Sequence, residues 1–173
     1  MSVISRVKTF FLLLFFLSPA VNAATYIAFA PAQLKIKTSS GSTKPSVSDF
    51  RFGYQTGVHK FELAYMTSIN DDNLNELVTD IPSVTSLFYR YDGNPAGDVK
   101  LEIILGYSQV EIDTTYVNEP AFNEKIEGFS YGVGLEEALQ SIPQLKFRVD
   151  FIQMYKGDNL ELKLFSVGLR YEF

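Results

Sequence analysis

The chain has 173 residues and a formal net charge of −5 at pH 7, and it is 46% hydrophobic and 14% aromatic, which fits a single domain. It contains no cysteine, which excludes disulfide scaffolds, thiolate metal sites and cysteine nucleophiles. Its single histidine, His59, excludes a multi-histidine metal site within one chain. The negative charge also argues against nucleic-acid binding, which requires a basic surface.

The first 23 residues have the pattern of a secretory signal peptide. Arg6 and Lys8 form a positive start, residues 10–17 are an uninterrupted apolar run, and small residues precede Ala23. The apolar run is too short for a transmembrane helix, which needs about 20 residues. We expect cleavage after Ala23, so that an exported domain of residues 24–173 remains.

After residue 23, apolar and polar residues alternate with a period of two, which predicts β-strands. Pro31 lacks a donor for strand pairing, which predicts an edge-like position, a bulge or a kink in the first strand. The eight expected strands lie, in chain order, near residues 25–38, 50–55, 61–65, 87–91, 100–107, 129–136, 145–151 and 165–173. Turn-forming segments separate them at residues 39–46, 57–59, 70–82, 92–97, 114–123, 138–143 and 156–159.

The two faces of these strands differ in their residue types. The polar face combines glycines such as Gly132 and Gly134 with long side chains such as Arg90 and Arg148, as expected where a narrow lumen must be filled. The other face consists almost entirely of Phe, Tyr, Leu, Val and Ile. Alternation alone allows a soluble barrel with the apolar face inside or a membrane barrel with that face outside. The polar face favours the second, an all-β, eight-stranded antiparallel up-and-down transmembrane β-barrel.

The mature chain resembles the small outer-membrane β-barrel family, which includes the OmpA transmembrane domain and OmpX-like proteins. Its last strand looks like the terminal signature read by the outer-membrane assembly machinery of Gram-negative bacteria. The resemblance implies that both termini are periplasmic, that this machinery is a partner during insertion, and that the barrel contacts outer-membrane lipids and lipopolysaccharide. We expect a monomer. The residues of the terminal signature are Phe165, Val167, Leu169, Tyr171 and Phe173.

Periplasmic termini would place the turns near residues 57–59, 92–97 and 138–143 inside and the other four connections outside. Along the outward face, the apolar residues give way to charged ones at the predicted outer end, for example after Tyr107, where Glu111 and Asp113 follow. A lipid-facing band of finite height predicts such a charged collar, because about 9 to 11 residues suffice for a strand to span the membrane.

The inward positions carry bases and acids in nearly equal number. Because leaving one partner of a buried ion pair alone costs about 3 to 5 kcal/mol, we expect these residues to pair with one another. We therefore predict a plugged, salt-bridged lumen, with a gated or proton-conducting path as the alternative. The predicted lumen charge network consists of Arg51, Glu62, Arg90, Lys100, Glu102, Glu136, Lys146, Arg148, Asp150, Arg170 and Glu172.

Nearer the predicted outer rim, the inward positions become apolar. Three interpretations remain open: a hydrophobic plug, a pocket for a lipid or another apolar small molecule, or a bulge that turns these residues outward. The positions are Met66, Val84, Val110, Ile112, Ile126, Ile152, Met154, Leu162 and Leu164.

The sequence does not indicate an enzyme, and we predict no catalytic residue, cofactor or metal ion. His59 lies in the predicted tight turn of residues 57–60 without a neighbouring serine, so we expect a solvated turn residue. The acidic residues between 71 and 80 lack the spacing of a calcium loop and indicate a hydrated loop. Two functions remain: a structural or surface-interaction protein of the outer membrane, or binding and transport of a small apolar molecule through the upper lumen.

Overall fold

The computed structural model describes residues 23–39, 41–74, 76–116, 120 and 122–173. The predicted signal peptide therefore lies outside the described residues, apart from Ala23. Within these ranges, no α-helix has the length and apolarity required to span a bilayer.

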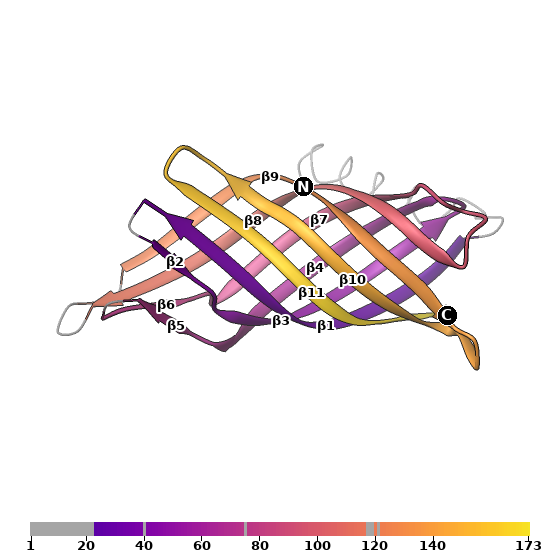
Figure 1. Ribbon diagram of the computed structural model, residues 1–173, viewed down its shortest axis with the longest axis horizontal. Helices are drawn as coiled ribbons and strands as arrows, with labels where there is room; N and C mark the ends of the chain where they lie inside the picture. Colours follow the sequence, from indigo (N-terminus) through magenta and orange to yellow (C-terminus); the bar gives the residue numbers. More distant parts are fainter. Residues whose placement is uncertain (1–22, 40, 75, 117–119, 121) are drawn as a thin grey trace, which may run out of the picture.

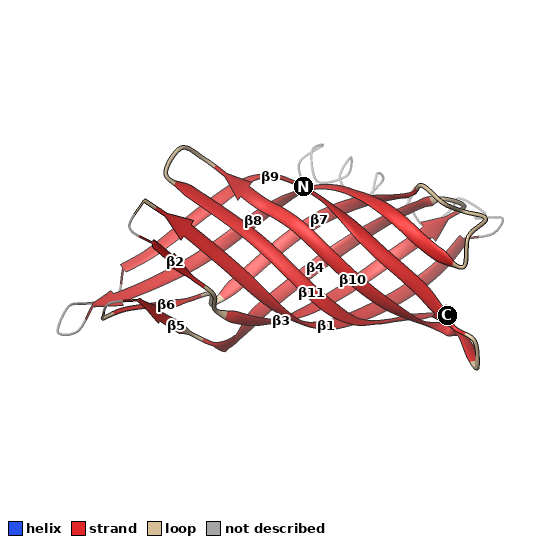
Figure 2. Cartoon of the chain, in the orientation of Figure 1, coloured by secondary structure: helices blue, strands red, loops and turns tan. Residues whose placement is uncertain are grey.

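Eight long antiparallel strands form a closed barrel (Figures 1 and 2). Each pairs with the next long strand in the chain, and the first pairs with the last, Tyr26 lying opposite Glu172, so that the ring closes. The predicted fold class is confirmed. The long strands are β1 (Ala23–Thr38), β3 (Ser46–Thr56), β4 (His59–Asn70), β7 (Ser83–Asp92), β8 (Val99–Tyr116), β9 (Phe122–Leu139), β10 (Ile142–Lys156) and β11 (Leu160–Glu172).

Three short strands extend the wall at one end of the barrel (Figure 1). β2 (Gly41–Thr43) pairs with the end of β1, whereas β5 (Asp72–Leu74) and β6 (Leu77–Asp80) form a hairpin whose second strand pairs with β8. The prediction of loops over residues 39–46 and 70–82 is therefore wrong in part. Such short segments carry little periodic signal and become strands because long neighbours offer free backbone groups.

The two ends of the barrel, the loop end and the terminal end, differ in the elements that they carry. The loop end carries β2, β5, β6 and the turn at residues 157–159. The terminal end carries Phe173 and the turns at residues 57–58, 93–98 and 140–141. At this end, Phe173 N donates a hydrogen bond to the Thr25 carbonyl. The long strands β8 and β9 reach farthest toward the loop end, where they pair up to Thr114 and Phe122.

Pro31 lies within β1 rather than at an edge. It is the partner of Ser48 on β3, while the β1–β11 ladder lacks only Ala30 and Pro31 and continues in unchanged register at Ala32. The expectation of an edge-like position or a register-shifting bulge is wrong, because closure of the barrel gives β1 a neighbour on each side.

The alternation of the sequence corresponds to the two faces of the barrel wall. Phe147 and Leu169 are 42% and 46% exposed on the outside, whereas Arg148 and Arg170 are 5% and 0% exposed on the inside. The apolar side chains thus form the outer surface, and the charged side chains point into the barrel. This is the arrangement expected of a barrel whose solvent is lipid.

The barrel wall has a register shift in β10 between Gln153 and Tyr155. This irregularity does not turn the apolar upper positions outward, because Met154, Leu162 and Leu164 are completely buried. The bulge interpretation of these residues is therefore wrong. Met154 keeps the inward parity of Ile152, and the extra residue shifts the pairing beyond it, where Tyr155 and Lys156 lie opposite Leu162 and Glu161.

Candidate functional site: the barrel interior and the loop end

Arg90 on β7 lies at the centre of the charged interior and has no exposed surface. Its Nη2 atom is 2.5 Å from Oε2 of Glu102 and 2.6 Å from Oδ1 of Asp150, and its Nη1 atom is 3.4 Å from Oε2 of Glu62. One guanidinium thus joins acids from β4, β8 and β10. The planar fork of arginine suits such multiple carboxylate contacts.

Glu62 on β4 is the corresponding acidic centre. Arg148 donates to both of its oxygens at 2.7 and 2.9 Å, and Arg51 lies 3.1 Å away. The Tyr26 hydroxyl donates a further hydrogen bond at 2.9 Å. Because Glu62 and its partners come from different parts of the wall, these contacts cross the lumen and hold opposite sides of the barrel together.

Two charged residues of this layer were missed by the sequence analysis. Lys60 was assigned to a turn, but it belongs to β4 and points inward to contact Glu102 and Glu136, the second at 2.8 Å. Asp49 lies 2.5 Å from Arg51. Both follow the inward parity, two positions from Glu62 and Arg51 respectively, so starting each expected strand one residue earlier would have included them.

The remaining predicted charges lie toward the terminal end. Lys146 is 2.8 Å from Glu172, and Arg170 contacts Glu172, Glu136 and the ring of Tyr26. Lys100 does not join the central layer. It pairs at 3.8 Å with Asp92, which had been assigned to a turn.

Bases and acids of the interior balance. Seven of each take part in the interior ion pairs, so the charged interior as a whole has no formal net charge when all are ionised. At its terminal end, a cavity of about 70 Å³ lies between Lys60, Lys100 and Lys146. The bases are Arg51, Lys60, Arg90, Lys100, Lys146, Arg148 and Arg170, and the acids are Asp49, Glu62, Asp92, Glu102, Glu136, Asp150 and Glu172.

Three buried serines follow the charged layer in the direction of the loop end. The Ser86 and Ser130 hydroxyls each lie 2.7 Å from that of Ser108, and Ser130 also donates to the Met154 carbonyl at 2.8 Å. Each buried hydroxyl thus has a partner. The serines form the boundary between the ionic and the apolar interior.

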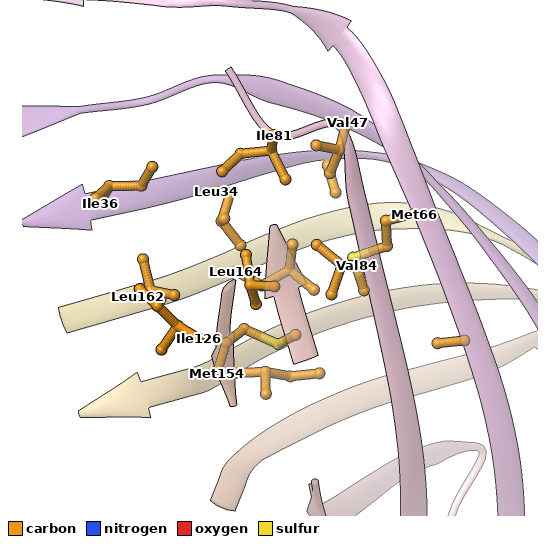
Figure 3. Packing of buried hydrophobic residues seen from close by; sticks show 14 of the residues in the cluster. Leu34, Ile36, Val47, Met66, Ile81, Val84, Ile126, Met154, Leu162 and Leu164 are labelled. Carbon is orange, nitrogen blue, oxygen red and sulfur yellow. The ribbon is translucent and has the colours of Figure 1, made fainter. Parts of the chain in front are cut away.

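An apolar cluster fills the barrel beyond the serines (Figure 3). All nine positions predicted at this level belong to it, and the side chains of Leu34, Val47 and Ile81 join from segments whose pattern was irregular or assigned to a loop. Met66, Met154, Leu162 and Leu164 have no exposed surface. The nine predicted positions are Met66, Val84, Val110, Ile112, Ile126, Ile152, Met154, Leu162 and Leu164.

The outward collar at the loop end contains ion pairs exposed to solvent. Lys125 on β9 is 2.8 Å from Glu111 on β8, and Ser83 donates to the same carboxylate at 2.8 Å. These two hydrogen bonds lower the pKa of Glu111. On the opposite wall, Lys163 is 3.1 Å from Glu161.

His59 is not a solvated turn residue. It begins β4 on the outward face, where its Nδ1 lies 2.8 Å from the Tyr89 hydroxyl and its ring packs against Tyr89 and Tyr91. These rings resemble the aromatic girdle found at the interfaces of membrane barrels. Within the described ranges, no group of three or more His, Asp or Glu side chains is arranged to hold a metal ion.

Comparisons with solved structures place this geometry among known folds. Neisserial surface protein A (NspA) has a TM-score of 0.64 and 17% identity, over 88% of this chain and 99% of that one. Ail, the attachment invasion locus protein of Yersinia pestis, in complex with the heparin analogue sucrose octasulfate, has a TM-score of 0.63 and 14% identity, over 87% and 99%. A major outer membrane protein from Thermus thermophilus has a TM-score of 0.60 and 12% identity, over 88% and 100%.

At these identities the structural matches establish the fold alone, and a search of curated proteins gives no match. The sequence itself matches the profile of the outer membrane protein beta-barrel domain over residues 10–173. Because this match spans most of the chain and agrees with the closed ring of eight strands, the chain belongs to the outer membrane protein beta-barrel domain family, and it shares the fold of NspA and Ail.

Proposed function

We propose that this barrel is a surface-interaction protein of the outer membrane, with a closed lumen, periplasmic termini and a loop end that faces the outside of the cell. The observation that carries the proposal is the division of the molecule into a filled barrel and a projecting outer sheet. The barrel serves as an anchor, and the outer sheet is the part available to a partner.

The closed lumen is supported by the packing inside the barrel. An eight-stranded ring leaves room for little more than side chains, and Arg90, Met154 and Leu164 occupy it without exposed surface. The alternative function, transport or binding of a small apolar molecule, requires space among the side chains of the apolar cluster. The burial of these side chains favours a plug over a pocket.

The outer sheet consists of β5, β6 and the outer parts of β8 and β9. From Phe122 to Gly128, β9 pairs with β8, whereas its ladder with β10 reaches only to Tyr131. Phe122 is 64% exposed. An unpaired strand edge binds extended peptides through backbone hydrogen bonds, which supports a protein as the partner.

Ail was solved with a heparin analogue, which supports an external binding role for barrels of this type. The outer sheet described here carries Glu111 and Glu127 on its outward face, on β8 and β9. Like charges would repel a polysulfate at this surface. We therefore propose a protein partner, rather than a sulfated polysaccharide, for the outer sheet.

Removal of the tip of the outer sheet, where β8 and β9 extend beyond Ile112 and Glu124, tests the proposed function. Ile112 and Glu124 are ladder partners, so replacing residues 113–123 with Asn-Gly joins β8 to β9 by a two-residue turn in unchanged register. We expect the shortened barrel to insert but to lose adhesion to other cells at equal surface density. A variant with a four-residue Gly/Ser segment in place of residues 94–97 is the control. Undiminished adhesion of the shortened barrel would contradict the proposal.

Orientation is tested separately with single cysteines, since the chain has none of its own. We expect an impermeant maleimide to label Asp158→Cys, at the loop end, on intact cells. Asn94→Cys, at the terminal end, should react only after the outer membrane is opened. The reverse pattern would show that the loop end faces the periplasm.

A further inference from the structure

Pro31 interrupts the ladder that closes the barrel. β1 and β11 are the first and last long strands of the ring and lie side by side in the wall (Figure 1), and their ladder lacks Ala30 and Pro31. On the other side of β1, the ladder with β3 is continuous through both residues. The interruption is therefore confined to the side of β1 that faces β11.

The nitrogen of Pro31 points toward β11. In an antiparallel ladder, the residues that exchange backbone hydrogen bonds with one neighbour recur at every second position. The Thr25 carbonyl accepts a hydrogen bond from Phe173 N at the end of β11, so every second residue from Thr25 to Pro31 faces that strand. In the register on both sides of the gap, Pro31 lies opposite Val167. Because proline has no N–H, the Val167 carbonyl lacks the donor that another residue would supply.

The outer face of the wall offers no replacement for this donor. Pro31 is exposed on that face, and Phe29 and Leu169 beside it are 48% and 46% exposed in the lipid-facing band. Acyl chains donate no hydrogen bonds, and a backbone group without a partner is costly in hydrocarbon. A donor for the Val167 carbonyl therefore has to come from within the protein wall or from the barrel interior.

A small cavity lies at this place on the inner side of the wall. Its volume is about 10 Å³, which is about the space that one water molecule requires. Ala28 and Ala30 of β1 line it, together with Gly168, whose nitrogen is bonded to the carbonyl carbon of Val167. The cavity thus adjoins the peptide group that lost its ladder partner.

Ser166 contributes a hydroxyl group to the lining of this cavity. Ser166 is 3% exposed, and its hydroxyl forms no hydrogen bond with the residues that the structure describes. A buried hydroxyl without a partner is unusual in a folded protein. Arg51 and Arg148 also line the cavity, but their guanidinium groups donate to carboxylates of the charged layer. The cavity therefore brings together a hydroxyl and a carbonyl that both need a partner.

We propose that one water molecule binds in this cavity and replaces the missing N–H of Pro31. It donates one hydrogen bond to the Val167 carbonyl and accepts one from the Ser166 hydroxyl. Its second hydrogen faces the carboxylate of Asp49, which also lines the cavity. The ring of strands is thus closed at this level by a bound water within the lipid-facing band. This site belongs to the membrane anchor and does not rest on the proposed surface function.

Nuclear magnetic resonance of the folded barrel in micelles tests the site. We expect transfer of magnetisation from water to the methyl groups of Ala28 and Ala30, which line the cavity. The methyl group of Ala64, which has no exposed surface and does not line the cavity, should show no such signal.

Two variants each remove one partner of the water. Pro31→Val supplies an N–H that bonds directly to the Val167 carbonyl, so the signal at Ala30 should be lost. Ser166→Ala removes the hydroxyl and should also abolish the signal. Ser86→Ala is the matched control, because the Ser86 hydroxyl is buried at another level of the barrel, 2.7 Å from that of Ser108, and the signal at Ala30 should remain.

Absence of the Ala30 signal in the wild type would overturn the proposal, and so would its persistence in either variant. A signal that persists only in Pro31→Val would come from the exchanging Ser166 hydroxyl proton rather than from a bound water. Heat-dependent gel mobility verifies that each variant is folded, and the comparison with Pro31→Val decides if Ser166→Ala does not fold. Adhesion plays no part in this measurement, so failure of the proposed function remains distinguishable.

Discussion

Arg90 and Asp150 lie 60 positions apart in the chain and form a double ion pair at the centre of the barrel, with Nη1–Oδ2 and Nη2–Oδ1 distances of 3.0 and 2.6 Å. Arg90 comes from β7 and Asp150 from β10, which are not neighbours in the wall. The pair therefore spans the lumen and connects distant strands. Around it, the interior charges form a neutral network that fixes how the two sides of the barrel face each other.

Removal of one member of this pair should strongly destabilise the barrel. Arg90→Met leaves Glu62, Glu102 and Asp150 short of a cation, and a buried charge without its partner costs about 3 to 5 kcal/mol. Urea unfolding in lipid vesicles measures the loss. Lys125→Met, which breaks an exposed pair, should cost about 0 to 1 kcal/mol. Similar losses in both variants would argue against a central role for the interior network.

Gly134 provides the space that the double ion pair occupies. A Cβ atom at this position would lie 2.3 Å from Nη2 of Arg90 and 2.6 Å from Oδ1 of Asp150. Gly134→Ala should therefore cost about 1 to 3 kcal/mol, as overpacking does. The same substitution in the Arg90→Met background should cost less, because one of the two clashing groups, the Arg90 guanidinium, is gone. Additive costs in this double-mutant cycle would contradict the explanation.

The lipid-facing band predicts a position-dependent cost of charge. Leu87 is 64% exposed on the outward face of β7, so Leu87→Arg should destabilise the inserted barrel by about 2 to 4 kcal/mol. Gln109 lies on the same face, two residues beyond Tyr107 toward the loop end, and Tyr107 is the ladder partner of Leu87. Gln109→Arg should therefore cost only about 0 to 1 kcal/mol. Unfolding titrations in vesicles compare the two. Equal costs of the two substitutions would show that Leu87 does not lie deeper in the lipid-facing band than Gln109.

The filled interior predicts that the purified protein carries no steady ion current in planar bilayers. Met154→Ala and Leu164→Ala should each lower the stability by about 2 to 5 kcal/mol, because a cavity replaces packed side chains. The double variant should still show no steady current, since the charged layer below remains intact. Stable conductance in the wild type would contradict the closed lumen, and conductance appearing only in the double variant would show that the charged layer alone does not close it.

Much of this architecture could be predicted from the alternation of residue types. The inward position of Arg148 and the outward position of Phe147 follow from the period of two alone. The residues at which the strands begin and end were harder to predict. Lys60 and Asp92 were assigned to turns, because glycines and a proline nearby signal a chain reversal without giving the residue at which pairing stops.

The short strands and the register shift in β10 had no readable signal. β6 exists because Asp80 and its neighbours find partners near Asp113, far away in the sequence. The position of Lys156 opposite Glu161 depends on one extra residue opposite β11. Both are consequences of pairing between strands, which a local pattern of side chains does not encode.

The sequence by itself determined the class of barrel, the face that meets lipid and the inward direction of most of the interior charges. Only the tertiary structure decided which charges meet, such as Arg90 with Asp150, and that Lys35 lies opposite Lys163, which pairs with Glu161. The physical reason is that a period of two assigns each side chain to a face. Register, closure and strand tilt then set the distances between side chains on the same face. These three features arise only when all eight strands pair.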